Sequence, residues 1–368
     1  MAGLYVHIPF CHSKCAYCDF YSMPNAAKME QLIDALAKEW ELRRDEVDWS
    51  DTNTIYLGGG TPSIVPLPML DKLISTFDIR DVAEFTIEAN PEDVTAEKAE
   101  AWRKMGINRI SMGVQSLDDE QLRLIGRRHT ATEAIEAVDA IKKAGFDNFS
   151  LDLIYGLPGQ TLDSWRDSLL RLIDLQPCHL SAYMLSYEPG TRLTAMLKTG
   201  KVREADEETL IAMYDCLIEE ARKAGYEHYE ISNFAKPGRR AAHNSAYWDG
   251  TPYLGIGPSA HSYDGSQRRI NPANLKQYLE RIDAGEPAWA LDEEDEDNRF
   301  NDMLITALRT AEGVDLETLP ANRKSQLLKD AAPSVQSGDL TLTPTRLRFA
   351  ERSWLISDSI MSALVQIG

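Results

Sequence analysis

Three of the chain's five cysteines fall within eight residues, at Cys11, Cys15 and Cys18. They directly follow a strand-like run at residues 4–8, and α/β proteins keep their sites in loops at strand ends. The CxxxCxxC spacing brings three thiolates to one point without a fourth. A structural zinc site normally takes four protein ligands, whereas a cluster held by three cysteines keeps one iron open. The spacing therefore favours a [4Fe–4S] cluster, with zinc or inert core cysteines as alternatives.

A glycine-rich segment, GGGTP at residues 58–62, follows the second strand-like run. Glycines at such a place let the backbone approach a ligand without a Cβ in the way. The segment matches neither the GxGxxG nor the GxxxxGK[ST] phosphate loop. Taken alone, it could equally be a tight turn.

Polar residues end three further strand-like runs, at Glu88, Gln115 and Asp152. Polar side chains at the carboxyl ends of barrel strands usually line the site. Each one could instead cap the following helix or satisfy a loop. Together they indicate a common pocket at one end of a sheet.

The elements that must position these residues alternate regularly along the chain. Short β-branched and aromatic runs predict strands at residues 4–8, 54–57, 85–89, 109–113, 149–154 and 179–185. Apolar residues at three- and four-residue steps predict helices at residues 28–44, 69–77, 96–105, 131–144 and 161–175. This rhythm predicts βαβ units around a parallel sheet, an α/β fold.

An acidic run at residues 292–297 separates the last part of the chain. We therefore expect a core at residues 1–285 and a C-terminal domain at 292–368. The tail predicts helices at 299–310, 316–328 and 357–365 and a strand at 340–342, an α+β order that resembles a winged helix. Its eight basic and fourteen acidic residues give a net charge of −6, the wrong sign for binding DNA. A packing domain behind a solvated acidic linker is the favoured interpretation.

The overall charge of the chain argues against two kinds of binding partner. Among 368 residues, 39 Lys and Arg oppose 58 Asp and Glu, a net charge of −19, which repels nucleic acid and anionic membranes. No apolar run is long enough to cross a bilayer, and the first residues lack a secretory pattern. We expect a cytoplasmic protein without a transmembrane segment or a nucleic-acid partner, and an odd, clustered set of cysteines in that reducing compartment favours metal over disulfides.

With these motifs in place, the chain resembles the radical S-adenosylmethionine (SAM) superfamily. The signature of that family is the CxxxCxxC spacing with an aromatic residue before the last cysteine, here Tyr17. The resemblance implies a partial (β/α)6 TIM-like barrel and a [4Fe–4S] cluster on Cys11, Cys15 and Cys18. It also implies that the open iron chelates SAM, which the reduced cluster can cleave to a deoxyadenosyl radical.

The polar strand ends match one branch of the superfamily, the coproporphyrinogen oxidase-like proteins. The same branch also provides matches for an arginine at Arg127 and an aromatic on the first strand at Tyr5. The resemblance implies SAM contacts from Tyr5, Tyr17, Gly59, Gly60, Thr61, Glu88, Gln115, Arg127 and Asp152.

Within this branch, the chain resembles the heme chaperones more than the oxidase. The oxidase carries a further cysteine two residues after the triad, where this chain has Phe20, and an N-terminal extension that is not expected here. The chaperones carry an HNxxYW segment, present at residues 243–248. The resemblance implies heme-iron ligation by His243, heme contacts from Tyr247 and Trp248, heme-accepting partner proteins, and a homodimer as a candidate assembly.

Other interpretations of the heme segment remain open at this stage. A lone loop histidine is often a hydrogen-bonded structural residue, and both aromatics could pack in the core. The nearby Lys236, Arg239 and Arg240 could pair with heme propionates or form a solvated loop. The alternative function is an oxygen-independent coproporphyrinogen III oxidase, so whether the chain is an enzyme stays undecided.

Overall fold

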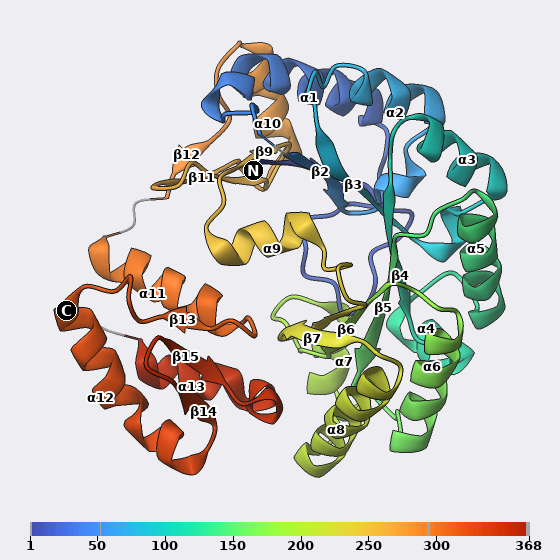
Figure 1. Ribbon diagram of the computed structural model, residues 1–368. Helices are drawn as coiled ribbons and strands as arrows, with labels where there is room; N and C mark the ends of the chain where they lie inside the picture. The colour runs from blue at the N-terminus through green and yellow to red at the C-terminus, as the bar shows by residue number, and fades with distance from the viewer. Residues whose placement is uncertain (1, 52, 293–294, 366–368) are drawn as a thin grey trace.

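The structure is a computed structural model that describes residues 2–51, 53–292 and 295–365 (Figure 1). Its main feature is a twelve-stranded sheet in which the first six strands lie side by side in chain order. All five pairings among these six strands are parallel. Their bounds are β1 Ala2–Ile8, β2 Asn53–Gly59, β3 Val82–Ala89, β4 Arg109–Gln115, β5 Phe149–Tyr155 and β6 His179–Met184.

Helices connect these strands and line the outer side of the curved sheet (Figure 1). They are α1 Met29–Arg43, α2 Leu67–Ile74, α3 Ala96–Lys104, α4 Asp119–Ile125, α5 Ala131–Lys143 and α6 Leu162–Asp174. The predicted α/β fold with a (β/α)6 core is confirmed, although helix α4 was not predicted. Capping boxes at Thr130 and Thr161 begin α5 and α6, so local sequence sets these starts. Along the described ranges, no helix is both long and apolar enough to span a membrane.

The sheet continues beyond the six-stranded core on both sides. Strands β9 Tyr253–Ile256, β10 His261–Tyr263, β11 Arg268–Ile270 and β12 Ala290–Leu291 extend it next to β1, and β8 Asn233–Ala235 and β7 Glu227–Glu230 extend it next to β6. The helices of this part are α7 Arg192–Lys198, α8 Glu207–Lys223, α9 Ala242–Asp249 and α10 Leu275–Asp283. Figure 1 shows α9 on the inner side of the sheet, opposite the outer helices.

The C-terminal part forms a small α+β unit, as expected. It contains α11 Glu296–Leu308, α12 Ala321–Ser337, α13 Ser357–Leu364 and a sheet of β13 Val314–Asp315, β15 Arg346–Phe349 and β14 Leu340–Leu342. The predicted tail helices are present, but α12 begins only after Pro320 and runs to residue 337. Residues 293 and 294 of the acidic run lie outside the described residues, and the division of the chain near 292 stays a prediction.

The C-terminal unit is joined to the core through backbone and side-chain contacts at β7. Ile231 N donates to Arg309 O at 3.0 Å, and Ala311 N donates to Tyr229 O at 3.0 Å. The Trp354 ring lies edge-on to His228 with centroids 4.4 Å apart. Apolar side chains from both parts belong to one continuous hydrophobic core, so the unit is fixed against the sheet.

We expect Trp354→Ala to destabilise this junction strongly. The indole is 4% exposed, and replacing a buried Trp by Ala costs about 3–5 kcal/mol of unfolding free energy. Urea denaturation followed by circular dichroism measures the loss. Leu342→Ala, at a side chain 44% exposed, is the control and should change stability by less than about 0.5 kcal/mol; equal losses in both variants would contradict the proposed junction.

Candidate functional site

The cysteine loop lies between β1 and α1 and is held in place by backbone hydrogen bonds. Cys11 N donates to Met23 O at 3.1 Å within the loop. Ala16 N donates to the last residue of α4 at 2.7 Å, and Ala16 O accepts from the N-terminal turn of α7 at 2.7 Å. The loop is therefore fixed to the C-terminal end of α4 and to the first turn of α7.

The three thiols sit on this loop with different exposure. Cys11 is buried, while Cys15 and Cys18 are half-buried. Burial raises the pKa of the Cys11 and Cys18 thiols, so they stay protonated until a metal displaces the proton. In the described part of the chain, no three His, Cys, Asp or Glu side chains are already gathered into a metal-binding group.

The donor set fits an iron–sulfur cluster in its chemistry. The cysteines occupy one short loop, and Arg127 Nη1 lies 3.6 Å from Cys15 Sγ. A cationic neighbour stabilises thiolates and offsets the negative charge of a thiolate-bound cluster. Cys178, by contrast, donates to Asn148 Oδ1 at 3.1 Å at the other end of β5, and Cys216 lies on α8.

The GGGTP segment ends β2 directly against β1 and the cysteine loop. Gly60 N donates to Ile8 O at 2.8 Å, and Thr61 N donates to Phe10 O at 2.7 Å. A Cβ on Gly60 would meet Phe10 O at 2.6 Å. Gly59 has φ +111°, and its N donates to Glu88 Oε2 at 3.1 Å. The glycines thus permit a close approach that any side chain would prevent.

Two half-buried carboxyl groups lie on β3 and β5. Glu88 is one residue from the end of β3, whereas Asp152 lies in the middle of β5, so the prediction that Asp152 ends its strand is wrong. Burial raises the pKa of Glu88 to about 7 and the pKa of Asp152 to about 6, and the pKa of Glu88 is raised further by the charge of Asp152. Tyr56 donates its hydroxyl proton to Glu88 Oε1 at 2.8 Å. A cation placed between these carboxyls would stabilise their ionised forms.

Gln115 and Arg127 complete the polar surface. Gln115 has φ +71° at a register shift between β4 and β5, and non-glycine residues rarely adopt this conformation. Its Oε1 is buried and has no hydrogen-bond partner within the described residues, so it is available to accept from a ligand or a water molecule. Arg127 Nη2 donates to Gly113 O at 2.5 Å and to Asn90 Oδ1 at 2.7 Å.

Sequence reasoning missed Asn90 and Tyr56. Asn90 Nδ2 donates to Thr61 Oγ1 at 3.2 Å, so its amide links Thr61 to Arg127. Asn90 directly follows β3, a position where polar residues often line a site in α/β proteins, and this position was an available signal. Nothing in the sequence marks Tyr56, because its contacts come from separate strands.

His243 is buried in the first turn of α9, and both of its ring nitrogens have partners. Nδ1 lies 2.8 Å from Thr54 Oγ1, and Nε2 lies 2.9 Å from the Tyr247 hydroxyl. The imidazole stacks on the Tyr56 ring with centroids 5.1 Å apart. Burial lowers the pKa of His243 to about 3, so the ring is neutral. Glu84 accepts from the backbone N–H of His243 at 3.0 Å and thereby caps the helix.

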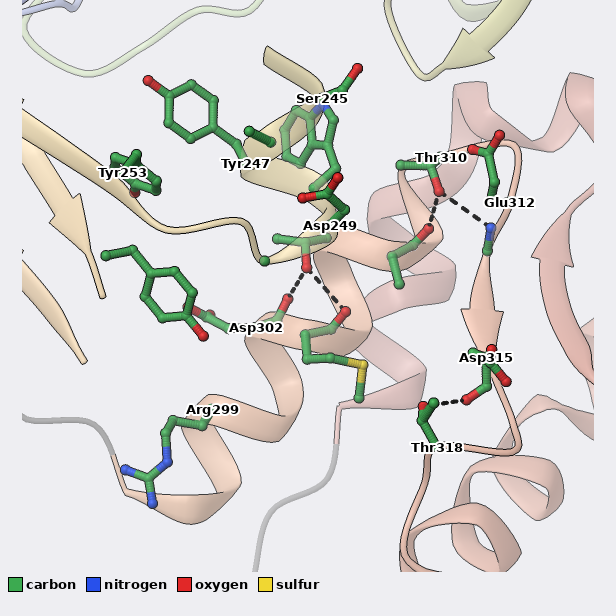
Figure 2. A pocket seen from close by; sticks show the side chains of 18 of the residues that line it. Ser245, Tyr247, Asp249, Tyr253, Arg299, Asp302, Thr310, Glu312, Asp315 and Thr318 are labelled. Atoms are coloured by element: carbon green, nitrogen blue, oxygen red, sulfur yellow. Dashed lines mark hydrogen bonds between the residues drawn. The ribbon is translucent and has the colours of Figure 1, made fainter. Parts of the chain in front are cut away.

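Tyr247 and Trp248 line a cleft of about 580 Å³ between α9 and the C-terminal unit (Figure 2). Arg309 lies over the Trp248 ring at 5.3 Å. Of the three predicted basic residues, only Arg240 lines the cleft. Lys236 lies over the Tyr226 ring at 4.1 Å, and Arg239 pairs with Asp147 at 3.0 Å, so neither is placed to meet a ligand there.

Comparisons with known proteins match this fold and site. Residues 5–172 match the model of the radical SAM superfamily. The chain is 34% identical over 342 residues to the heme chaperone HemW of Bacillus subtilis, covering 91% of this chain and 90% of that protein. It is 31% identical to the heme chaperone HemW of Mycobacterium tuberculosis, covering 99% and 94%.

A solved structure agrees with the same branch. The coproporphyrinogen III oxidase HemN from Escherichia coli superposes with a TM-score of 0.83 at 25% identity, covering 99% of this chain and 90% of that chain. Fold and site together define a radical SAM protein of the coproporphyrinogen oxidase-like branch. Within that branch, the chain belongs to the HemW family of heme chaperones.

Replacing Cys11, Cys15 and Cys18 together by Ala should abolish binding of cluster iron and sulfide. These are the thiols that the loop brings to one edge of the sheet. Iron and sulfide analysis after anaerobic reconstitution measures the effect. The double variant Cys178→Ala, Cys216→Ala is the matched control and should retain both; retention of both elements by the triple variant would refute the ligand assignment.

SAM should bind more tightly at pH 8 than at pH 6. Glu88, with its pKa near 7, is mostly neutral at pH 6 and ionised at pH 8, and the ionised form attracts the SAM cation, which predicts an affinity change of about tenfold. The groups that face it are Tyr5, Tyr56, Asp152 and Arg109. Calorimetry on reconstituted protein at both pH values gives the dissociation constants.

The variant Glu88→Gln isolates the contribution of Glu88 to the pH dependence. Any titration of SAM itself affects its binding to the wild type and to the variant equally. The variant should bind SAM more weakly at pH 8 and lose most of the pH dependence. The exposed Glu120→Gln should behave as wild type. An unchanged pH dependence in Glu88→Gln would show that another group controls binding.

Proposed function

We propose that the chain is a heme chaperone that holds a [4Fe–4S] cluster and SAM and transfers heme to acceptor proteins. The observation that carries this proposal is the cleft beside α9, because two aromatics of the HNxxYW segment line it. Its volume of about 580 Å³ falls within the range of small-molecule sites. The curated relatives are themselves named heme chaperones. A cytoplasmic location and a homodimer stay predictions.

In this proposal, Cys11, Cys15 and Cys18 bind the cluster. When bound, the cluster would supply an open iron for SAM and an electron to cleave it. The glycine backbone and Thr61 would flank SAM, while Glu88 and Asp152 would face its positive charge. The unpartnered Gln115 Oε1 supports a ligand donor at the end of β4. The other residues proposed to contact SAM are Tyr5, Tyr17 and Arg127.

Heme would lie in the cleft against Tyr247 and Trp248. Burial of about 300 Å² of apolar ligand surface would contribute on the order of 7 kcal/mol before the costs of association. His243 would ligate the iron as a neutral imidazole, the form that its lowered pKa favours. His243 is buried and is not among the residues that line the cleft. Because the Tyr247 hydroxyl occupies its Nε2, ligation of a heme in the cleft through this nitrogen requires that hydrogen bond to open and the Tyr247 side chain to move aside.

The similarity to HemN favours coproporphyrinogen oxidation as the second candidate function. One residue argues against it. Phe20, which takes the place of the oxidase's additional cysteine, is 67% exposed and supplies no thiolate. We therefore favour heme transfer over porphyrinogen oxidation.

One sample can separate the two functions. After anaerobic reconstitution, the protein should bind heme stoichiometrically in a titration followed by absorbance. With SAM and a reductant, the same sample should not convert coproporphyrinogen III to protoporphyrinogen IX. Catalytic product formation would restore the oxidase, and failure to bind heme would refute the chaperone.

His243→Ala should shift the Soret band and weaken heme binding without abolishing it, because apolar contact with the macrocycle persists. Replacing Tyr247 and Trp248 together by Ala should weaken binding through lost contact. Absorbance titrations measure both effects. His179→Ala is the control, since His179 is a second buried, hydrogen-bonded histidine, on β6. An unchanged spectrum and affinity in His243→Ala would place the iron ligand elsewhere.

A further inference from the structure

Two ion pairs cross the cleft and join the core to the C-terminal unit. Arg268 Nη1 on β11 lies 2.9 Å from Asp302 Oδ2 on α11. Arg240 Nη1, just before α9, lies 2.7 Å from Glu312 Oε1, just after α11. All four side chains line the cleft, and Figure 2 shows Asp302 and Glu312 on the C-terminal unit and Tyr247 on α9. Each pair therefore puts a core arginine and a C-terminal carboxylate at the same opening.

In both ion pairs, a carboxylate of a ligand can replace the carboxylate of the protein. Their side chains are between 31% and 56% exposed, and exposed ion pairs contribute little to stability because water and salt screen them. A guanidinium binds any carboxylate with the same planar geometry. A carboxylate on a ligand can consequently replace Asp302 or Glu312 at little cost to the fold.

The surface between the ion pairs suits a flat apolar ligand. Tyr247, Trp248 and Tyr253 line the cleft from the core side, and Met303 lines it from α11. Aromatic rings and a methionine offer large, polarisable contact surfaces. The cleft thus combines an apolar middle with arginines, which is the complement of a planar macrocycle that carries carboxylates.

We propose that the two carboxylates of a tetrapyrrole replace Asp302 and Glu312 on Arg268 and Arg240. This inference rests on the proposed heme function and names the groups that recognise the cargo. A chain with a net charge of −19 repels a dianion, so local arginines are needed to bind one. Exchange of the partners breaks both ion pairs across the cleft, while the backbone hydrogen bonds at β7 and the shared hydrophobic core keep the C-terminal unit in place.

The proposal predicts opposite effects from the two halves of each ion pair. Removing the arginines takes away the ligand's partners and should weaken binding. Removing the acids takes away its competitors and should strengthen binding. A merely structural role would make both sets of variants act in the same direction, because either half breaks the contact between the two parts of the chain.

The experiment titrates protoporphyrin IX, which carries the carboxylates without iron, and its dimethyl ester, which lacks the charges. The double variant Arg240→Gln, Arg268→Gln should weaken protoporphyrin binding by about tenfold or more. The double variant Asp302→Asn, Glu312→Gln should strengthen it. The effect of the acid variant is expected to be smaller, because Arg240 keeps a second carboxylate, Glu227, at 3.8 Å. Neither change should alter binding of the ester.

Controls keep the outcomes distinct. Arg44→Gln breaks an exposed pair with Asp78 at 3.0 Å outside the cleft and should bind as wild type, and circular dichroism verifies that each variant folds. Weaker binding by the acid variant, or equal effects on acid and ester, would overturn the carboxylate site while leaving heme binding intact. Failure of the wild type to bind protoporphyrin, its ester or heme would instead refute the proposed function itself.

Discussion

The contacts of one buried tyrosine connect the candidate SAM site to the candidate heme segment. The Tyr56 hydroxyl holds Glu88 at 2.8 Å, and its ring stacks on His243 with centroids 5.1 Å apart. Glu88 in turn accepts from the Gly59 backbone, while His243 contacts the Tyr247 hydroxyl. A displacement of Tyr56 would therefore disturb the carboxyl that faces SAM and the imidazole proposed to ligate iron, so the two sites share one rigid support.

That support depends on parallel strands in chain order. Because β1 to β6 are neighbours, their carboxyl ends meet at one edge and bring residues more than 100 positions apart into contact. Arg127, which touches both Cys15 and Asn90, shows this convergence. This convergence requires the glycines that end β2 and follow it, because a side chain on Gly60 would collide with the backbone at Phe10, next to the cysteine loop.

The sequence was informative where local rules decide the outcome. Periodicity located the six core strands and five of the helices that connect them. Helix α11 begins earlier than predicted because Asp295 caps it and Glu296 occupies its first turn, where negative charge is stabilising; the acidic run had been interpreted as a linker. The types of the site residues could be predicted, but not the burial of His243 or the ion pair of Arg268 with Asp302, because these contacts join segments that only the tertiary fold brings together.

The state of His243 bears on how a chaperone could release its cargo. If His243 ligates the iron as proposed, binding through Nε2 would compete with the hydrogen bond to Tyr247, and the competent conformation would be populated only when that bond is open. The apparent affinity is then lower than the intrinsic affinity by the populated fraction. An enzyme that retains a heme cofactor gains nothing from such competition, whereas a carrier does, because re-formation of the internal hydrogen bond favours departure of the iron. In the proposed complex, the hydrogen bond between His243 and Tyr247 would therefore lower the affinity for iron and favour release of the heme.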